Sequence, residues 1–200
     1  MLQKIVIAVI DDDEGARDSM AALLDAAGYA LKMHGSGRHF LDDFDLATAC
    51  VIIDVYMPDM GGLELQQELA RRSINLPVIF VSGHAAVPVV VQAVKAGAID
   101  FIEKSSLSGA MLESVGRALK AGQEAASTLA KVSGAKMMLA RLTPRERNVM
   151  SLIVDGRSTK IAAYELGISP RTVEIHRARI MDKIGARNIA DVVRVAMMAA

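Results

Sequence analysis

The stretch VIIDVYMPDMGG, residues 51–62, places a carboxylate at the end of an apolar run. The run from Val51 to Ile53 has the branched, apolar character of a buried strand, and Asp54 follows it directly. Pro58 and a glycine pair then end the strand pattern. A carboxylate that only needs solvent has no reason to stand at such a place, so the stretch indicates a strand that delivers a reactive carboxylate.

Short apolar runs of this kind alternate with helical patterns over the first 122 residues. The predicted strands cover residues 4–10, 29–34, 50–54, 77–82 and 99–103. The predicted helices cover residues 11–27, 37–43, 62–72, 86–96 and a long segment from about 107. This alternation predicts an α/β domain with a parallel sheet covered by helices on both faces. Reactive groups gather at the carboxyl ends of the strands in such sheets, which is where Asp54 stands.

The pattern after Leu139 is entirely helical, with predicted helices over 143–154, 158–166, 169–184 and 188–199. The preceding segment is rich in Ala and Ser, and we expect it to be a continued helix that frays around Ser133-Gly134. The sequence therefore predicts two domains, residues 1–122 and 139–200, joined by a helical linker over 123–138.

Charge is divided unevenly between the two predicted domains. Residues 1–122 hold 10 basic and 16 acidic residues, a net charge of −6, and residues 139–200 hold 11 basic and 6 acidic residues, a net charge of +5. A basic second domain favours a polyanionic partner. Cys50 is the only cysteine, which excludes a disulfide within the chain and fits a reducing compartment. No secretory signal or membrane span is recognisable, so we expect a cytoplasmic protein without membrane contact.

Polar residues follow several of the predicted strands. They are Asp11 and Asp12, Asp54, Ser82 and Lys104. Adjacent strands lie about 5 Å apart, so these side chains can converge. Grouped carboxylates repel one another unless a cation such as Mg²⁺ joins them, and a carboxylate beside Mg²⁺ can attack phosphorus. Each residue also has a simpler reading: the acids can cap a helix, the lysine can be a solvated charge, and the serine can belong to a turn.

Residues 3–122 resemble the receiver domain of two-component response regulators. The matching stretches are VIDDDE, VIIDVYMPDMGGLEL, VSGH and KAGAIDFIEK. The resemblance implies a doubly wound sheet in the strand order 2-1-3-4-5. It also implies the site residues: Asp54 as phosphoacceptor, Asp11, Asp12, Asp54 and the backbone carbonyl of Tyr56 as Mg²⁺ ligands, Ser82 as switch hydroxyl, Lys104 as phosphoryl-sensing lysine and Phe101 as switch aromatic.

One position departs from the receiver pattern. The family usually has proline directly after the lysine, often in a cis peptide bond, and this chain has Ser105. A cis bond before a residue other than proline costs about 3 kcal/mol, so the loop either bears that cost or runs trans.

The basic half has the form of a helix-turn-helix. The stretch GRSTKIAAYELGISPRTVEIHRARIMDKIGA contains a short helix, a glycine, and a second helix with Ser169 as its cap and Pro170 at its first position. Basic residues on that second helix suit contact with phosphates. A small helical bundle with solvated arginines is the alternative interpretation of this segment.

LTPRERNVMSLIVDGRSTKIAAYELGISPRTVEIHRARIMDKIGA resembles the LuxR-type DNA-binding domain, and the whole chain resembles the FixJ subgroup of the NarL/LuxR-type regulators. The resemblance implies that Lys160 and Thr172 contact phosphates. It implies that Glu174, Ile175 and Ala178 face base edges. It places Arg171, Arg177 and Arg179 at the groove walls. Two positions depart from that family: its usual Asn before Lys160 is absent, and Ala162 replaces its usual Ile.

The resemblance implies a transcription regulator rather than a turnover enzyme. A sensor histidine kinase would phosphorylate Asp54, and the protein would then dimerise and bind promoter DNA, with RNA polymerase as a further partner. Two alternatives belong to other classes of protein. An aspartyl-phosphate phosphatase would need a second Asp two residues after the nucleophile, where this chain has Tyr56. An adaptor with a receiver-like domain would act without phosphorylation, and the acidic residues and Lys104 argue against it.

Overall fold

The computed structural model describes residues 4–84 and 86–199. The chain divides into two compact units, Met1–Glu124 and Ala125–Ala200, and each is described by itself. The first unit is built around a sheet and the second consists of helices.

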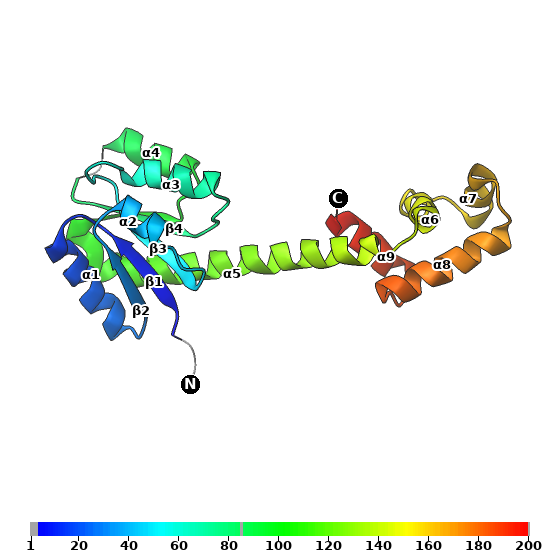
Figure 1. The fold of residues 1–200 in the computed structure, drawn as a ribbon, viewed down its shortest axis with the longest axis horizontal. Coiled ribbons are helices and arrows are strands. Elements are labelled where there is room, and N and C mark those ends of the chain that lie inside the picture. The colour runs from blue at the N-terminus through cyan, green and yellow to red at the C-terminus, as the bar shows by residue number, and fades with distance from the viewer. Residues whose placement is uncertain (1–3, 85, 200) are drawn as a thin grey trace. The chain divides into compact units, whose positions relative to one another are not determined.

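The first unit contains a five-stranded parallel sheet (Figure 1). Its strands are β1 (Val6–Ile10), β2 (Ala30–His34), β3 (Thr48–Asp54), β4 (Val78–Ser82) and β5 (Asp100–Glu103). They lie in the order β2-β1-β3-β4-β5, which confirms the predicted strand order. Ile53 lies between Ile10 of β1 and Phe80 of β4. This register brings the residues that follow Ile10 and Ile53 to the same edge of the sheet.

Helices cover both faces of this sheet, as the continuously apolar strands predicted (Figure 1). One face packs against α1 (Glu14–Ala26) and the first part of α5 (Leu107–Ala140). The other face packs against α2 (Gly37–Asp42), α3 (Gly62–Arg71) and α4 (Val87–Lys95). The apolar residues of β3 between these layers are almost completely buried.

Gly62 allows the amino end of α3 to lie directly on β3. A Cβ atom at this position would lie 2.4 Å from the Asp54 carbonyl oxygen and 3.0 Å from side-chain atoms of Ile53 and Phe80. The backbone oxygen cannot move away without disturbing the strand, so only glycine fits. The second glycine of the opening stretch therefore fixes how closely α3 approaches the strand that ends in Asp54.

Helix α5 runs unbroken from Leu107 to Ala140, a length of 34 residues. The prediction that it frays around Ser133-Gly134 is therefore wrong. The surrounding residues are mostly Ala, Lys, Met and Leu, which are strong helix formers and outweigh one glycine. Ala135, directly after the expected break, is buried, so the helix is packed rather than frayed at this point.

A short 3₁₀ helix, η1 (Lys104–Ser106), connects β5 to α5. All peptide bonds of the described residues are trans, so the loop at Ser105 runs trans. Of the two alternatives for this position, the trans loop is therefore the one found.

The second unit contains α6 (Pro144–Val154), α7 (Thr159–Leu166), α8 (Pro170–Ile184) and α9 (Ile189–Ala199). The hydroxyl groups of Thr143, Ser158 and Ser169 accept hydrogen bonds at the amino ends of α6, α7 and α8. Gly167 ends α7 with a left-handed φ of 64°. Ala162 is buried in the shared core of these helices, so the small residue at this position still faces inward.

Candidate phosphoacceptor and cation site

Three carboxylates and one ammonium group meet at the carboxyl edge of the sheet. Lys104 Nζ lies 2.7 Å from Asp11 Oδ2 and 3.0 Å from Asp54 Oδ2. Asp11, Asp12 and Asp54 each offer an oxygen that lies within 4.8 Å of the others. The register of β1, β3 and β4 and the loop after β5 thus bring together residues that are far apart in the sequence.

Within the acidic run 11–14, one carboxylate caps a helix and two others belong to the site. Asp13 is the N-cap of α1, and its Oδ1 accepts a hydrogen bond of 3.0 Å from the Ala16 N–H, which lowers the pKa of this carboxyl. Asp11 is completely buried, and Asp12 is exposed. The helix-capping interpretation therefore holds for Asp13, whereas Asp11 and Asp12 face the site.

The carboxylates of the site carry more negative charge than Lys104 can balance. Burial raises the pKa of Asp54, the hydrogen bond from Lys104 opposes this rise, and the nearby Asp11 charge adds to it. Burial disfavours the charged form of Lys104, but hydrogen bonds to Asp11 and Asp54 outweigh it and raise the pKa of the amine. Three carboxylates face one ammonium, so the ionised cluster carries a net charge of about −2, and its hard oxygen ligands fit a divalent cation such as Mg²⁺.

Tyr56 is bonded to the Asp54 carboxylate through its backbone. Its backbone N–H donates a hydrogen bond of 3.4 Å to Asp54 Oδ1, and 55% of the residue is exposed. The ring is therefore free of close packing and is available to cover the carboxylate.

Ser82 is the last residue of β4, and Phe101 lies on β5 opposite Phe80. The Ser82 hydroxyl is buried and donates a hydrogen bond of 2.9 Å to the His84 carbonyl. The structure shows no hydrogen bond between Ser82 and Asp54 within the described ranges. The Phe101 ring is half-buried with its centroid 6.3 Å from that of Phe80.

Sequence reasoning missed Arg17. Its Nη1 donates to the backbone carbonyls of Asp11, at 2.7 Å, and Asp12, at 3.0 Å. Side chains in the first turns of a helix point toward its amino end, so an arginine one turn into the predicted helix was a signal that could have been read.

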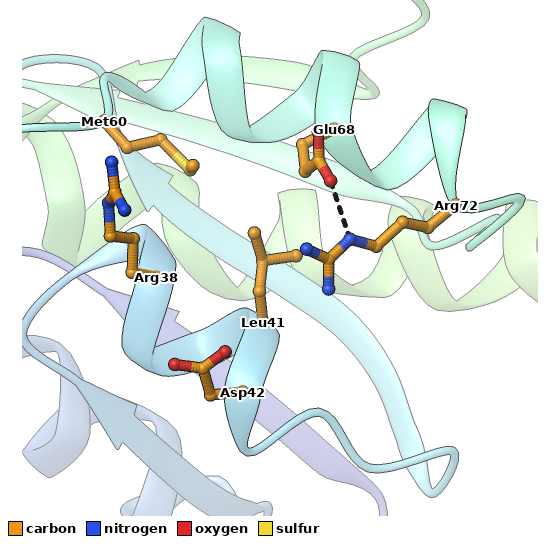
Figure 2. Close-up of a pocket in the computed structure, with 6 residues that line it drawn as sticks. All are labelled: Arg38, Leu41, Asp42, Met60, Glu68 and Arg72. Carbon is orange, nitrogen blue, oxygen red and sulfur yellow. Dashed lines mark hydrogen bonds and ion pairs between the residues drawn. The ribbon is translucent and has the colours of Figure 1, made fainter.

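A separate hollow of about 290 Å³ lies between α2 and α3. Figure 2 shows its lining: Arg38, Leu41, Asp42, Met60, Glu68 and Arg72. Arg72 Nε donates to Glu68 Oε1 at 2.7 Å, whereas Arg38 has no hydrogen bond or ion pair with any described residue. None of the lining residues belongs to the acidic cluster, so the hollow is not part of that site.

The predicted DNA-contacting residues lie on α7 and α8, and every one of them is at least partly open to solvent. They are Lys160, Arg171, Thr172, Glu174, Ile175, Arg177, Ala178 and Arg179. Glu174 is already engaged, since its Oε1 accepts a hydrogen bond of 2.7 Å from the Thr159 hydroxyl and lies 3.5 Å from Arg177 Nη1. This contact joins the two helices of the helix-turn-helix.

Comparison with protein families agrees with both units. Residues 7–116 match the response regulator receiver domain, and residues 140–196 match the bacterial regulatory proteins of the luxR family. Together with the fold and the acidic site, these matches define a DNA-binding response regulator. The chain belongs to the response regulators that combine a receiver domain with a luxR-type domain.

Individual relatives are transcriptional regulators. The chain is 40% identical to the transcriptional regulatory protein FixJ of Azorhizobium caulinodans, covering 100% of this chain and 95% of the relative. It is also 40% identical to FixJ of Rhizobium meliloti, over 96% of this chain and 94% of the relative.

Solved structures are similar over nearly the full length. The response regulator StyR matches with a TM-score of 0.84 and 32% identity over 98% of this chain and 99% of StyR. Full-length FixJ from B. japonicum matches with a TM-score of 0.61 and 38% identity over 98% of each chain. Across residues 4–84 and 86–199, no helix has the length and apolar character that crossing a membrane requires.

Proposed function

We propose that Asp54 accepts a phosphoryl group from a sensor histidine kinase in the cytoplasm and that this event controls DNA binding by the second unit. One Asp54 oxygen attacks phosphorus, so a P–O bond forms while the P–N bond to the kinase imidazole breaks. The product is an acyl phosphate on Asp54 and a neutral histidine. The observation that supports this role is the contact of Lys104 with both Asp54 and Asp11 beside the third carboxylate of Asp12.

The residues around Asp54 would serve the transfer in distinct ways. Asp11, Asp12, Asp54 and the backbone carbonyl of Tyr56 would hold Mg²⁺, which would supply charge neutralisation. Lys104 would keep its ammonium on a phosphoryl oxygen once Asp54 is modified. Ser82 would exchange its bond to the His84 carbonyl for a second phosphoryl oxygen, and Phe101 would then move into the space that is vacated.

The two rival functions are less well supported. A phosphatase of the aspartyl-phosphate type lacks its acid, because Tyr56 stands two residues after Asp54. A phosphorylation-independent adaptor would not need two buried carboxylates to share one ammonium, an arrangement that is costly without a cation. We therefore assign the site to self-phosphorylation without turnover of a substrate.

The proposed transfer is tested by incubation with acetyl phosphate and Mg²⁺ followed by intact-mass measurement. The parent chain should gain one phosphoryl group only when Mg²⁺ is present, and Asp54→Asn should gain none. Asp59→Asn is a matched control, since its carboxyl has no resolved interaction with the site. Equal modification of Asp54→Asn and the parent would contradict the assignment.

The second unit would bind promoter DNA through α8. Lys160 and Thr172 are assigned to phosphates, Ile175 and Ala178 to base edges, and Arg171, Arg177 and Arg179 to the groove walls. Glu174 is assigned to a base edge as well: its Oε1 is bonded to Thr159, and its other carboxylate oxygen would accept from a cytosine amino group. The two domains are proposed as residues 1–122 and 139–200. The second piece alone should bind DNA with an affinity that falls steeply with salt, and the first should not bind.

Phosphorylation would produce a dimer through the surface of α4, β5 and the start of α5. Val87, Val91 and Val94 of α4 are 74%, 46% and 56% exposed. An exposed apolar stripe beside Phe101 is suited to a second copy.

Sedimentation with beryllofluoride, a phosphoryl mimic, should show a dimer of the parent and a monomer of Val91→Asp. A dimer indifferent to that change would exclude this surface. The dimer would place two second units on paired half-sites and would contact RNA polymerase there.

A further inference from the structure

Arg17 binds the backbone of the acidic loop rather than any acidic side chain. It lies one turn into α1, and both hydrogens of its Nη1 are directed at successive carbonyl oxygens, those of Asp11 and Asp12, at 2.7 and 3.0 Å. A guanidinium holds two acceptors in a rigid fork, so this contact restrains the peptide unit that joins the two aspartates.

The other two acids of the loop have anchors of their own. The Asp11 N–H donates to the His34 carbonyl of β2 at 3.2 Å, and its carboxylate faces Lys104. The Asp13 N–H donates to Asp11 Oδ1 at 3.0 Å, and its carboxylate caps α1. Asp12 is exposed, and the bond from Arg17 is its one hydrogen bond among the described residues.

We propose that Arg17 is a positioning residue for the divalent cation, acting by holding the backbone of Asp12 so that its carboxylate faces Asp11 and Asp54. The proposal rests on the proposed function, because it takes the cluster of three acids as the cation site. Positioning of this kind is strong when a ligand has no other support, and loss of such a supporting contact weakens metal binding by about 10- to 100-fold.

The sign of the effect separates positioning from simple charge. Arg17 carries a positive charge close to the acids, and that charge repels a cation. If Arg17 acted only through its charge, its removal would strengthen Mg²⁺ binding. If it acts by holding the loop, its removal weakens Mg²⁺ binding even though a repulsive charge has gone.

The test is a Mg²⁺ titration of the full, unphosphorylated chain, followed by the amide NMR signals of Asp54 and Tyr56. Arg17→Gln removes the charge and the fork, and we expect its Kd for Mg²⁺ to rise about tenfold. Arg17→Lys keeps the charge but places it on a shorter, more flexible side chain without the planar guanidinium, so it should hold the two carbonyls less firmly and its Kd should lie between those of Arg17→Gln and the parent. Arg38→Gln is the matched control, with the same loss of charge at an arginine that lines the hollow between α2 and α3 and has no hydrogen bond or ion pair with a described residue (Figure 2), and its Kd should stay unchanged.

A second readout separates positioning from general stability. At saturating Mg²⁺, Arg17→Gln should be phosphorylated by acetyl phosphate as fast as the parent, because excess cation restores the occupied site. A variant that is merely less stable would show a lower melting temperature in chelator with an unchanged Kd, which would overturn the proposal.

Each remaining outcome has a definite meaning. A Kd for Arg17→Gln that equals or falls below that of the parent overturns the positioning role, as does an equal rise for Arg38→Gln. If Arg17→Gln fails to fold, Arg17→Lys decides the matter: a weaker Kd supports the role and a parental Kd overturns it. A parent chain that binds no Mg²⁺ overturns the cation site of the proposed function and this role with it.

Discussion

The two units of the chain differ in how fully their buried carboxylates are paired with positive charge. At the sheet edge, buried Asp11 and Asp54 share the single ammonium of Lys104. In the helical unit, buried Glu146 has the ammonium of Lys183 to itself at 2.7 Å, and it also accepts a hydrogen bond of 2.8 Å from the Thr143 N–H. One cluster is left with excess negative charge, and the other is balanced.

This difference indicates which cluster is built for a ligand. A buried carboxylate with a matched cation and backbone donors is satisfied within the fold, so it stabilises the fold and needs nothing further. A cluster with more buried acid than base is destabilising until a cation balances its negative charge. The comparison therefore predicts that removing an acid will have opposite effects on stability in the two units.

The largest expected effect is on the helical unit. Glu146→Ala removes the capping box at the start of α6 and leaves Lys183 without its partner, so the unit should lose about 2–3 kcal/mol of stability. Hydrogen exchange of peptides from α6 and α8, followed by mass spectrometry, localises the loss. Glu165→Ala, at an exposed acid whose nearest cation is 3.7 Å away, should leave exchange unchanged. Equal exchange for Glu146→Ala and the parent would mean that the balanced pair does not hold this unit together.

Asp54→Asn should stabilise the sheet unit, whereas Glu146→Ala destabilises the helical unit. The substitution leaves Lys104 paired with Asp11 alone and removes a charge whose burial is unfavourable, so without Mg²⁺ the sheet unit should gain roughly 1 kcal/mol. Exchange of amides in β3 and β4 measures the gain, and the same variant should accept no phosphoryl group. Destabilisation by Asp54→Asn in Mg²⁺-free buffer would show that the acidic cluster is as balanced as Glu146 and Lys183.

Lowering the pH should change the stability contributions of the two clusters in opposite directions, and by less than the substitutions do. The bond from Lys183, with the backbone N–H of Thr143, lowers the pKa of Glu146 to about 2 from an ordinary value of 4.5. Its contribution to stability is therefore present above the ordinary value and is lost as the pH falls toward 2. The pKa of Asp54 is raised, so its penalty is present at neutral pH and disappears as the pH falls through that raised pKa.

These pH effects are measured as differences in the urea midpoint between parent and variant. The deficit of Glu146→Ala should shrink as the pH falls from the ordinary glutamate pKa toward 2, because the parent loses its advantage. The gain of Asp54→Asn in Mg²⁺-free buffer should shrink at a higher pH than the Glu146 deficit does. If the Glu146→Ala deficit and the Asp54→Asn gain shrank over the same pH range, the opposite pKa shifts of Glu146 and Asp54 would be wrong.

The sequence predicted the features that depend on local pattern. The apolar run before Asp54, the glycine pair after it and the alternation of strands and helices follow from short-range rules, and they placed Asp11, Asp54 and Lys104 at one edge of the sheet. The cap at Ser169 was equally local. Such signals can be read because each depends on a few neighbouring residues.

The features that were missed depend on contacts between distant residues or on competing forces. No local rule shows that Asp13 takes the helix cap and thereby leaves Asp12 to the site. The bond from Arg17 to two carbonyls requires the geometry of the loop. Helix α5 continues through Gly134, and the neighbouring Ala135 is buried, which cannot be read from composition.

The smallest expected effect concerns the lifetime of the phosphoryl group on the unbalanced site. Tyr56 is half exposed and its N–H is bonded to Asp54 Oδ1, and we expect its ring to cover the path that an attacking water must use. Tyr56→Ala should open this path and speed hydrolysis by about threefold, which corresponds to less than 1 kcal/mol of barrier. Tyr164→Ala, at a highly exposed tyrosine of the helical unit, is the control. Decay of the phosphorylated chain, followed by intact mass, measures both variants. Because the water attacks only an occupied site, a Tyr56→Ala variant that decays no faster than the control would mean that the bound cation and Lys104, rather than the ring, set the lifetime.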